Sequence, residues 1–517
     1  MSGRNADGGG RENPNMIPED VPVTPDLLRP YESTIAPPQG LPRQESYASS
    51  ITESAIAEEY RDRDSFVKRD DPLATRRVSS TRTLINIVKG MIGPGCLSLP
   101  LAFRFGGIWT SMALTVVVGL LTIHSMAMLV KCAQHLCTRS GKLELDYGHL
   151  AKKAIDFGPL NWRRHSRKAL YFTNTMVILY QIGVCSVQFV FMGSNLSKVV
   201  DAINGEKANL STSAWIGITL APVILINFIR RLRILALISA VGNIFLLIGF
   251  VIIFQYIAQA PTCYATNKTW FGGFNDLLLF MGALLYSFEG QAMILPMENR
   301  MKNPEDLIRP FGVLHTGMAL VIIVFTATGF FGYTKFGALT SGSITLDLPN
   351  EPLYQVVVVV MILVVYFGLP LQEFVIVAAL WPSIKRKLPS RLATSPVDLI
   401  LEYSFRITAI LLQLVIALAI PNLDKIVPLV GVTAGMVISF ILPATLDMIT
   451  FWNFWQLEFD PLKRYLMIFK DVILLLIGIF GMIAGLYVNI LNIMHGDSVE
   501  GSDTKHTFPN GDWKCTL

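Results

Sequence analysis

Charged residues are scarce in this sequence of 517 residues. Asp, Glu, Lys and Arg make up 16% of the chain, whereas soluble domains carry about 25%. Hydrophobic residues make up 52%, and they gather in long runs with almost no charge. Such runs indicate that lipid, not water, surrounds most of the chain. The net charge of +5 lies mainly in short loops between the runs, which argues against nucleic-acid binding.

The sequence also lacks the motifs of catalysis. It contains no phosphate-binding loop, no metal-ligand spacing and no nucleophile–base pair on a soluble domain. We therefore expect no enzyme activity, no catalytic residue, no metal and no cofactor.

No long apolar run occurs in the first 80 residues. This stretch is polar and rich in Pro, Ser and charge, so we expect a disordered cytosolic tail over 1–80 and no cleavable signal peptide. Within it, Arg76-Arg77-Val78-Ser79 places basic residues just before a serine, as basophilic kinases prefer. Ser79 is therefore a candidate phosphorylation site.

Cysteine is also rare, and its six copies give no disulfide framework. Cys263 and Cys515 fall in polar segments that we expect on the same, non-cytosolic face. They either pair there or stay free thiols, because spacing alone does not decide between the two.

Beyond the tail, eleven apolar runs reach the length that a membrane-spanning helix needs, about 20 residues. We expect an all-α integral membrane protein with a transmembrane domain over 81–491 and an extracellular or lumenal C-terminal tail over 492–517. The predicted spans are 82–103, 108–131, 169–199, 213–230, 234–258, 275–297, 311–332, 353–380, 399–420, 426–446 and 470–491.

The loops predict the orientation of these spans. Lys and Arg cluster in 131–168, after the fourth span and after the eighth span, so the positive-inside rule places these loops and the N-terminus in the cytosol. Two glycosylation sequons, at Asn209 and Asn267, fall in loops on the opposite face. The plasma membrane and the lysosomal or endosomal membrane are both open as locations.

The first span contains a cluster of helix-breaking residues near its middle. It reads Gly90-Met91-Ile92-Gly93-Pro94-Gly95, three glycines and one proline in six residues. Proline removes a donor and clashes with the preceding turn, and each Gly costs about 1 kcal/mol relative to Ala. Broken backbone in a membrane is tolerated only beside protein or a cavity, so we expect these six residues to bind substrate, with freed amides suited to a carboxylate.

The sixth span has a matching interruption, Tyr286-Ser287-Phe288-Glu289-Gly290. It comes five spans after the first break, where an inverted five-helix repeat would place the partner. We expect Tyr286, Ser287, Phe288 and Gly290 to bind substrate. Glu289 is an acid deep in the span and hence a candidate ion-coupling residue, with a structural ion pair as the alternative.

Two further residues are candidates near these breaks. Lys89 lies one turn before the first break, where its ammonium either reaches the interface or acts as a fixed cation inside the bundle. Tyr180 lies midway along the third span, where either substrate binding or core packing would explain it.

These residues also carry a family resemblance. Thr83-Leu84-Ile85, Lys89-Gly90 and Gly93-Pro94-Gly95 resemble the first helix of proton-coupled (proton-assisted) amino acid transporters of the amino acid/auxin permease family. Ser287-Phe288-Glu289-Gly290, Pro296-Met297-Glu298-Asn299 and the Gly332–Thr345 region are similar to later parts of that family. The resemblance covers about residues 80–490. It implies eleven helices, with two inverted five-helix repeats, broken helices 1 and 6 and one extra helix, alternating access, and small neutral amino acids as substrates.

Two positions bear on ion coupling. Proton-coupled members of that family carry histidine where this chain has Asn86, so Glu289 becomes the proton-coupling candidate. Sodium-coupled relatives carry an asparagine near the position of Lys89. A fixed ammonium at this position would repel sodium, which favours sodium independence. The sequence thus predicts a glycosylated symporter whose partners are an amino acid, lipid and possible protons. An uncoupled facilitator and an amino acid sensor signalling through the tail are the alternatives.

Overall fold

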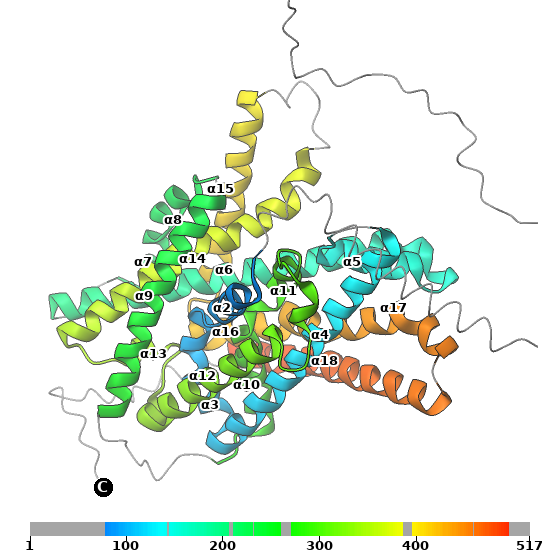
Figure 1. The fold of residues 1–517 in the computed structure, drawn as a ribbon. Coiled ribbons are helices and arrows are strands. Elements are labelled where there is room, and N and C mark those ends of the chain that lie inside the picture. The colour runs from blue at the N-terminus through cyan, green and yellow to red at the C-terminus, as the bar shows by residue number, and fades with distance from the viewer. Residues whose placement is uncertain are drawn as a thin grey trace, which may run out of the picture. The chain divides into compact units, whose positions relative to one another are not determined.

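The computed structural model describes residues 78–141, 144–205, 210–230, 232–259, 270–385, 395–458 and 460–495 (Figure 1). These residues lie within one compact unit, residues 65–517. Several predictions fall outside the described residues: the tail up to residue 77, Asn209, Asn267, Cys263, Cys515 and the C-terminal segment from residue 496. The side chain of Glu289 is also outside them.

Every element of regular secondary structure in the described ranges is a helix, apart from one isolated bridge between Val78 and Met301. Nine helical stretches there are long and apolar enough to cross a membrane, and a bent pair in the first span makes ten. The predicted fourth span corresponds to Thr212–Asn227, which is apolar but shorter. An all-helical membrane fold with broken first and sixth spans is thus confirmed.

The helices follow the predicted spans closely in position. The first span is α2 (Ser80–Met91) with α3 (Leu99–Gly106), the fourth is α7 (Thr212–Ile218) with α8 (Leu220–Asn227), the sixth is α10 (Phe274–Ser287) with α11 (Ile294–Glu298), and the tenth is α16 (Leu423–Val430) with α17 (Leu442–Glu458). The remaining spans are α4 (Ile108–Ser140), α6 (Ser166–Asn204), α9 (Leu232–Gln259), α12 (Val313–Phe336), α14 (Pro352–Lys385), α15 (Ser395–Ala419) and α18 (Pro461–His495). Several of these helices extend beyond their apolar runs into the polar flanks.

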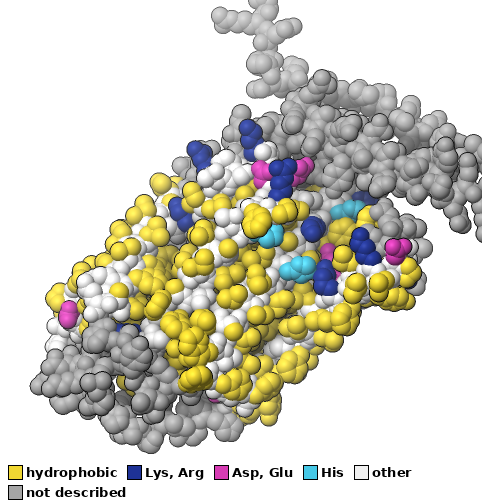
Figure 2. Space-filling model, turned by 60° about the horizontal axis from the view of Figure 1, so that its bottom comes forward, with side chains coloured by type: hydrophobic (Ala, Val, Ile, Leu, Met, Phe, Trp, Pro, Cys, Tyr) yellow, Lys and Arg dark blue, Asp and Glu magenta, His cyan; other side chains and the backbone are white. Residues whose placement is uncertain are grey.

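The broken spans lie inside the bundle. α10 packs against α3, α16 and α18, and α12 packs against α2, α3 and α4, while α14 lies along α6 and α9 (Figure 1). Exposed apolar side chains cover the perimeter, for example Leu237 and Val251 on α9 and Leu476 on α18. Figure 2 shows this broad hydrophobic surface, with most of the visible charged side chains toward one edge. Such a surface suits lipid, because the unbroken helices at the perimeter satisfy their own backbone groups.

The segments between the predicted spans contain short helices that were not predicted, and the longest of them follows α4. α5 (Tyr147–Phe157) lies in the basic segment 131–168, which we expected to be a loop, and it packs against α6. Its signal is in the sequence: Asp146 caps it by accepting a hydrogen bond from the His149 amide at 2.7 Å, and Leu150 and Ala154 are buried at helical spacing.

Each end of the bundle carries a short helix, and we call the ends the α5 end and the α13 end. The α5 end carries α5, the start of α2 and the end of α14. The α13 end carries α13 (Ile344–Asp347), the end of α3 and the start of α16.

Candidate functional site

The first span breaks where its glycines and proline predict. α2 ends at Met91, Gly93 adopts an extended conformation, and a 3-10 turn over Pro94–Ser98 leads into α3. The two halves meet at an angle of 43°. Pro94 stands in the first turn, where its missing N–H removes no helical hydrogen bond.

The sixth span breaks in the same way. α10 ends at Ser287, Phe288 leaves the helical conformation at φ −81° and ψ 36°, and a 3-10 turn over Glu289–Met293 leads into α11. Backbone groups are therefore released from regular helical pairing in both spans.

The two breaks lie against each other. The one hydrogen of the Ser287 hydroxyl is shared between the carbonyl oxygens of Gly95, at 2.8 Å, and Ala283, at 3.0 Å. The Ser98 hydroxyl also donates to the Gly95 carbonyl at 2.8 Å. A methyl group on Gly95 would lie 2.9 Å from the Cα of Ser287, so only glycine allows this approach.

A second glycine contact joins the breaks on the side toward the α5 end. A methyl group on Gly290 would lie 2.4 Å from the sulfur of Met91. A methyl group on Gly90 would lie 3.3 Å from the terminal carbon of the Met297 side chain. The predicted residues of both spans are therefore brought together by close backbone packing.

A small cavity of about 10 Å³ adjoins the breaks toward the α13 end. That volume has room for about one water molecule. Its lining comes from both breaks, from α6, from the loop before α13 and from α16: Pro94, Ser98, Val187, Gln188, Phe191, Tyr286, Gly342, Ser343, Leu423 and Val427. The Gln188 side-chain oxygen is buried and, among the described residues, has no hydrogen-bond partner. An acceptor in this state suits a ligand that brings a donor.

Other predicted residues lie away from this cavity. Phe288 is buried against Phe325 of α12, with ring centroids 5.0 Å apart. Tyr180 is buried on α6 and faces Gly435, in a π-helical turn that follows α16. Lys89 is exposed in the last turn of α2, and Ile92 is half-buried. Their predicted roles in binding and ion coupling stay predictions.

The α13 end is covered by the loop between α12 and α14. Arg104 of α3 pairs with Asp424 of α16 at 3.0 Å and donates to the Thr340 carbonyl. Lys198 of α6 donates to the carbonyls of Thr345 and Leu346, at 2.9 and 3.0 Å. These bonds hold the loop in place, and two of its residues, Gly342 and Ser343, line the cavity.

Asp347 completes this cover. Its carboxylate accepts hydrogen bonds from the Ser341 amide at 3.0 and 3.1 Å. Burial raises the pKa of the Asp347 carboxyl from 3.8 to about 7, against the opposing effects of Ser341 and Lys198. The loop therefore contains a group that titrates near neutral pH.

The α5 end is closed by backbone hydrogen bonds. The Val78 amide donates to the Arg300 carbonyl at 2.8 Å, and the Lys302 amide donates to the Val78 carbonyl at 2.9 Å. The Ser80 hydroxyl donates to Asp306 at 2.8 Å. The start of the first span is thus tied to the segment after the sixth, and Ser79 lies exposed within this connection.

Sequence reasoning missed part of the lining. Gln188 is a polar residue in the middle of an apolar span, which is itself a signal for a functional position. Ser98 follows the first break by three residues, and Gly342 and Ser343 lie in a loop far away along the chain. In the described part of the chain, no three His, Cys, Asp or Glu side chains lie close enough to hold a metal ion.

Known proteins match this chain over most of its length. The family described as "Transmembrane amino acid transporter protein" matches residues 76–491. The probable amino acid transporter skat-1 of Caenorhabditis elegans is 35% identical over 427 residues, which cover 81% of this chain and 91% of that protein. The proton-coupled amino acid transporter-like protein pathetic of Drosophila melanogaster is 30% identical over 448 residues, which cover 86% and 90%.

Among solved structures, the inward-facing conformation of Mhp1 is similar to this chain. It has a TM-score of 0.49 and 12% sequence identity, over 82% of this chain and 92% of that chain.

Proposed function

Because this chain belongs to the transmembrane amino acid transporter family, we propose that it carries small neutral amino acids by alternating access, with the substrate bound where the first and sixth spans break. Members of this family are amino acid transporters and not enzymes. The observation that carries the proposal is the direct contact of the two breaks beside a cavity, with Ser287 bonded to Gly95. Paired breaks of this kind mark substrate sites in transporters.

The chemistry at the breaks matches the two poles of a zwitterion. The 3-10 turn at Pro94 and α3 present the positive end of a half-helix, which favours a carboxylate. The unsatisfied oxygen of Gln188 and the carbonyl groups released at Tyr286–Gly290 favour an ammonium group. Pro94, Gln188 and Tyr286 line one small volume, which supports a substrate of small size.

Closure at both ends supports alternating access. The Arg104–Asp424 pair covers the α13 end and the Val78 hydrogen bonds close the α5 end. A cavity of about 10 Å³ is too small for an amino acid, so binding requires one end to open. Release on the other side then requires the second set of bonds to break.

For ion coupling we propose protons and not sodium, with Glu289 as the coupling residue. The name of the Drosophila relative, proton-coupled amino acid transporter-like, supports this choice. Asn86, exposed on α2, stands where proton-coupled members of the family carry histidine, and it cannot titrate, so Glu289 is the next candidate. Lys89 adds a positive charge on the same helix, which disfavours sodium.

Uptake of a radiolabelled amino acid panel into proteoliposomes at two pH values tests the proposal. We expect saturable uptake of small neutral amino acids, accumulation under an imposed pH gradient, and loss of accumulation with preserved exchange in Glu289→Gln. Gln188→Leu should raise the KM, because it removes the acceptor while keeping much of the side-chain volume. Absence of saturable flux for every amino acid would refute the proposal, and uptake that ignores the pH gradient would make the protein a facilitator.

We propose that the α5 end faces the cytosol. Lys and Arg of 131–168 lie at this end, as does Arg230, in agreement with the positive-inside rule. Glycosylation at Asn209 and Asn267, and any Cys263–Cys515 disulfide, then belong to the opposite side, at the cell surface or in a lysosome or endosome. Replacing both asparagines with Gln should remove a glycosidase-sensitive gel shift, and an unglycosylated wild-type protein would contradict this orientation.

A further inference from the structure

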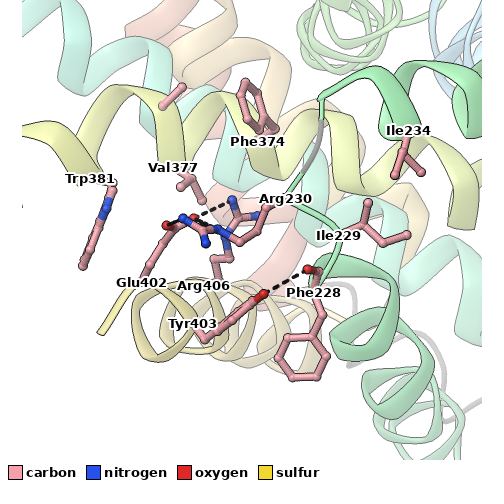
Figure 3. A pocket seen from close by; sticks show the side chains of 11 residues that line it. Phe228, Ile229, Arg230, Ile234, Phe374, Val377, Trp381, Glu402, Tyr403 and Arg406 are labelled. Atoms are coloured by element: carbon pink, nitrogen blue, oxygen red, sulfur yellow. Dashed lines mark hydrogen bonds and ion pairs between the residues drawn. The ribbon is translucent and has the colours of Figure 1, made fainter. Parts of the chain in front are cut away.

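A second, larger cavity lies away from the helix breaks, at the α5 end. Its volume is about 730 Å³, and it opens between the α8–α9 connection, α14 and α15 (Figure 3). No residue of the proposed substrate site lines it. The proposed transport mechanism therefore makes no use of this space.

The base of the cavity is an ionic cluster formed by Arg230, Glu402 and Arg406. Arg230 binds the Glu402 carboxylate through two nitrogens, at 3.1 and 2.5 Å, and Arg406 donates to the same carboxylate at 3.0 and 3.2 Å. Figure 3 shows both guanidinium groups meeting on Glu402. The Glu402 and Arg406 side chains are buried, whereas that of Arg230 is 40% exposed.

The charges of this cluster do not balance. Two guanidinium groups and one carboxylate give the lining a net charge of +1. A structural link between α15 and the α8–α9 connection needs only one cation for one carboxylate. Glu373, buried on α14, also interacts with Arg406 but does not line the cavity. Arg230, whose side chain is 40% exposed, is therefore the cation that an anionic ligand in the cavity would meet.

The walls of the cavity are mostly apolar. Eight of the eleven lining residues are apolar or aromatic: Phe228, Ile229, Ile234, Phe374, Val377, Ala378, Trp381 and Tyr403. Phe228 and Ile234 are themselves exposed at 42% and 39%. A small inorganic anion would leave these walls uncovered, whereas an amphiphile with an acyl chain would cover them.

Arg230 stands at the level expected for a lipid headgroup, because it follows by three residues the end of the apolar helix Thr212–Asn227. Glu402 and Arg406 lie deeper, five and nine residues inside the candidate span that starts at Val397, or about 8 and 14 Å from its end at 1.5 Å per residue. Trp381 ends the span of α14, at the position of an interfacial aromatic residue. We propose that this cavity binds one anionic phospholipid, its phosphate at Arg230 and one acyl chain along the apolar wall.

Native mass spectrometry of the full chain, purified with equal phosphatidylglycerol and phosphatidylcholine, tests this proposal. We expect wild type to retain one phosphatidylglycerol in preference to phosphatidylcholine. Arg230→Gln should weaken that binding about tenfold, the effect of losing one hydrogen bond to a charged group. In this variant Arg406 still pairs with Glu402, so the fold is retained.

A second variant and a control distinguish lipid binding in the cavity from lipid attraction by surface charge. Ala378→Phe fills the cavity but keeps both arginines, and it should also reduce retention. Arg309→Gln removes an exposed cation at the same end, 62% exposed and paired with Glu305 and Asp306, and should retain lipid as wild type does. Equal retention of the two lipids, unchanged retention in both cavity variants, or equal competition by free glycerol phosphate would each overturn the proposal.

Discussion

The contact between the two helix breaks makes a sharp prediction for Gly95→Ala. The added methyl group would lie 2.9 Å from the Cα of Ser287 and 3.4 Å from the Tyr286 ring, whereas ordinary contacts start at 3.4 Å. Because the first neighbour is backbone, the spans must separate by roughly half an ångström to relieve the overlap. Overpacking of this kind costs about 1–3 kcal/mol.

This cost falls on the packed arrangement of the two breaks, where we propose that the substrate binds. We therefore expect Gly95→Ala to lower the initial rate of amino acid uptake into proteoliposomes by about tenfold or more, since about 1.4 kcal/mol corresponds to a factor of ten. Binding measured by scintillation proximity should fall in parallel. Yield and monodispersity in detergent should stay close to wild type, because the overlap is confined to one contact.

Gly368→Ala is the matched control. Gly368 lies in α14, and a methyl group there would meet nothing within 4 Å. This substitution should preserve uptake and stabilise the helix by up to about 1 kcal/mol. If Gly95→Ala transported with wild-type rate and KM, the close approach of the breaks would not matter for transport, and the reasoning would fail.

Three further predictions concern the same region. Ser287→Ala removes the hydrogen bond to Gly95 and should lower thermal stability by about 0.5–1.5 kcal/mol, with a higher KM in uptake assays; an unchanged KM would contradict a shared site. Because burial raises the pKa of Asp347 to about 7, the folded loop binds this proton more tightly than an unfolded one. Protection of the loop from hydrogen exchange, corrected for intrinsic rates, should therefore fall as pH rises from about 4 to 7, and Asp347→Asn should abolish that fall. Arg104→Gln removes the partly exposed pair with Asp424, worth about 0.2–1 kcal/mol, and should speed cysteine labelling at an engineered Ser343→Cys; equal labelling rates would argue against this pair as part of the cover.

The spans and their breaks were predictable because their causes are local. A run of apolar residues identifies a membrane helix wherever it packs, and Gly93-Pro94-Gly95 disrupts a helix in any surroundings. The direction of a side chain has no such local cause. Phe288 packs against Phe325 instead of lining the cavity, since the turn at this residue and the position of α12 together determine where the ring lies.

The cavity-lining residues from distant parts of the chain could not be predicted, because their positions also have no local cause. Ser343 approaches the breaks only because Lys198 and Arg104 hold its loop in place, and these bonds join residues more than 140 positions apart. Gln188 was accessible as an isolated polar residue in an apolar span, yet its unsatisfied oxygen depends on packing. α5 carried an amphipathic pattern and a capping residue, and its basic surroundings obscured both.

The backbone bonds at Val78 give the polar tail a mechanical connection to the transport cycle. Opening the bundle at that end requires the start of α2 to leave residues 300–302, with the loss of two hydrogen bonds of about 0.5–1.5 kcal/mol each. A partner that grips the tail, or a phosphate on Ser79 close to the Ser80–Asp306 bond, would change how often that separation occurs. Turnover would then respond to events outside the membrane without any change in how substrate is held.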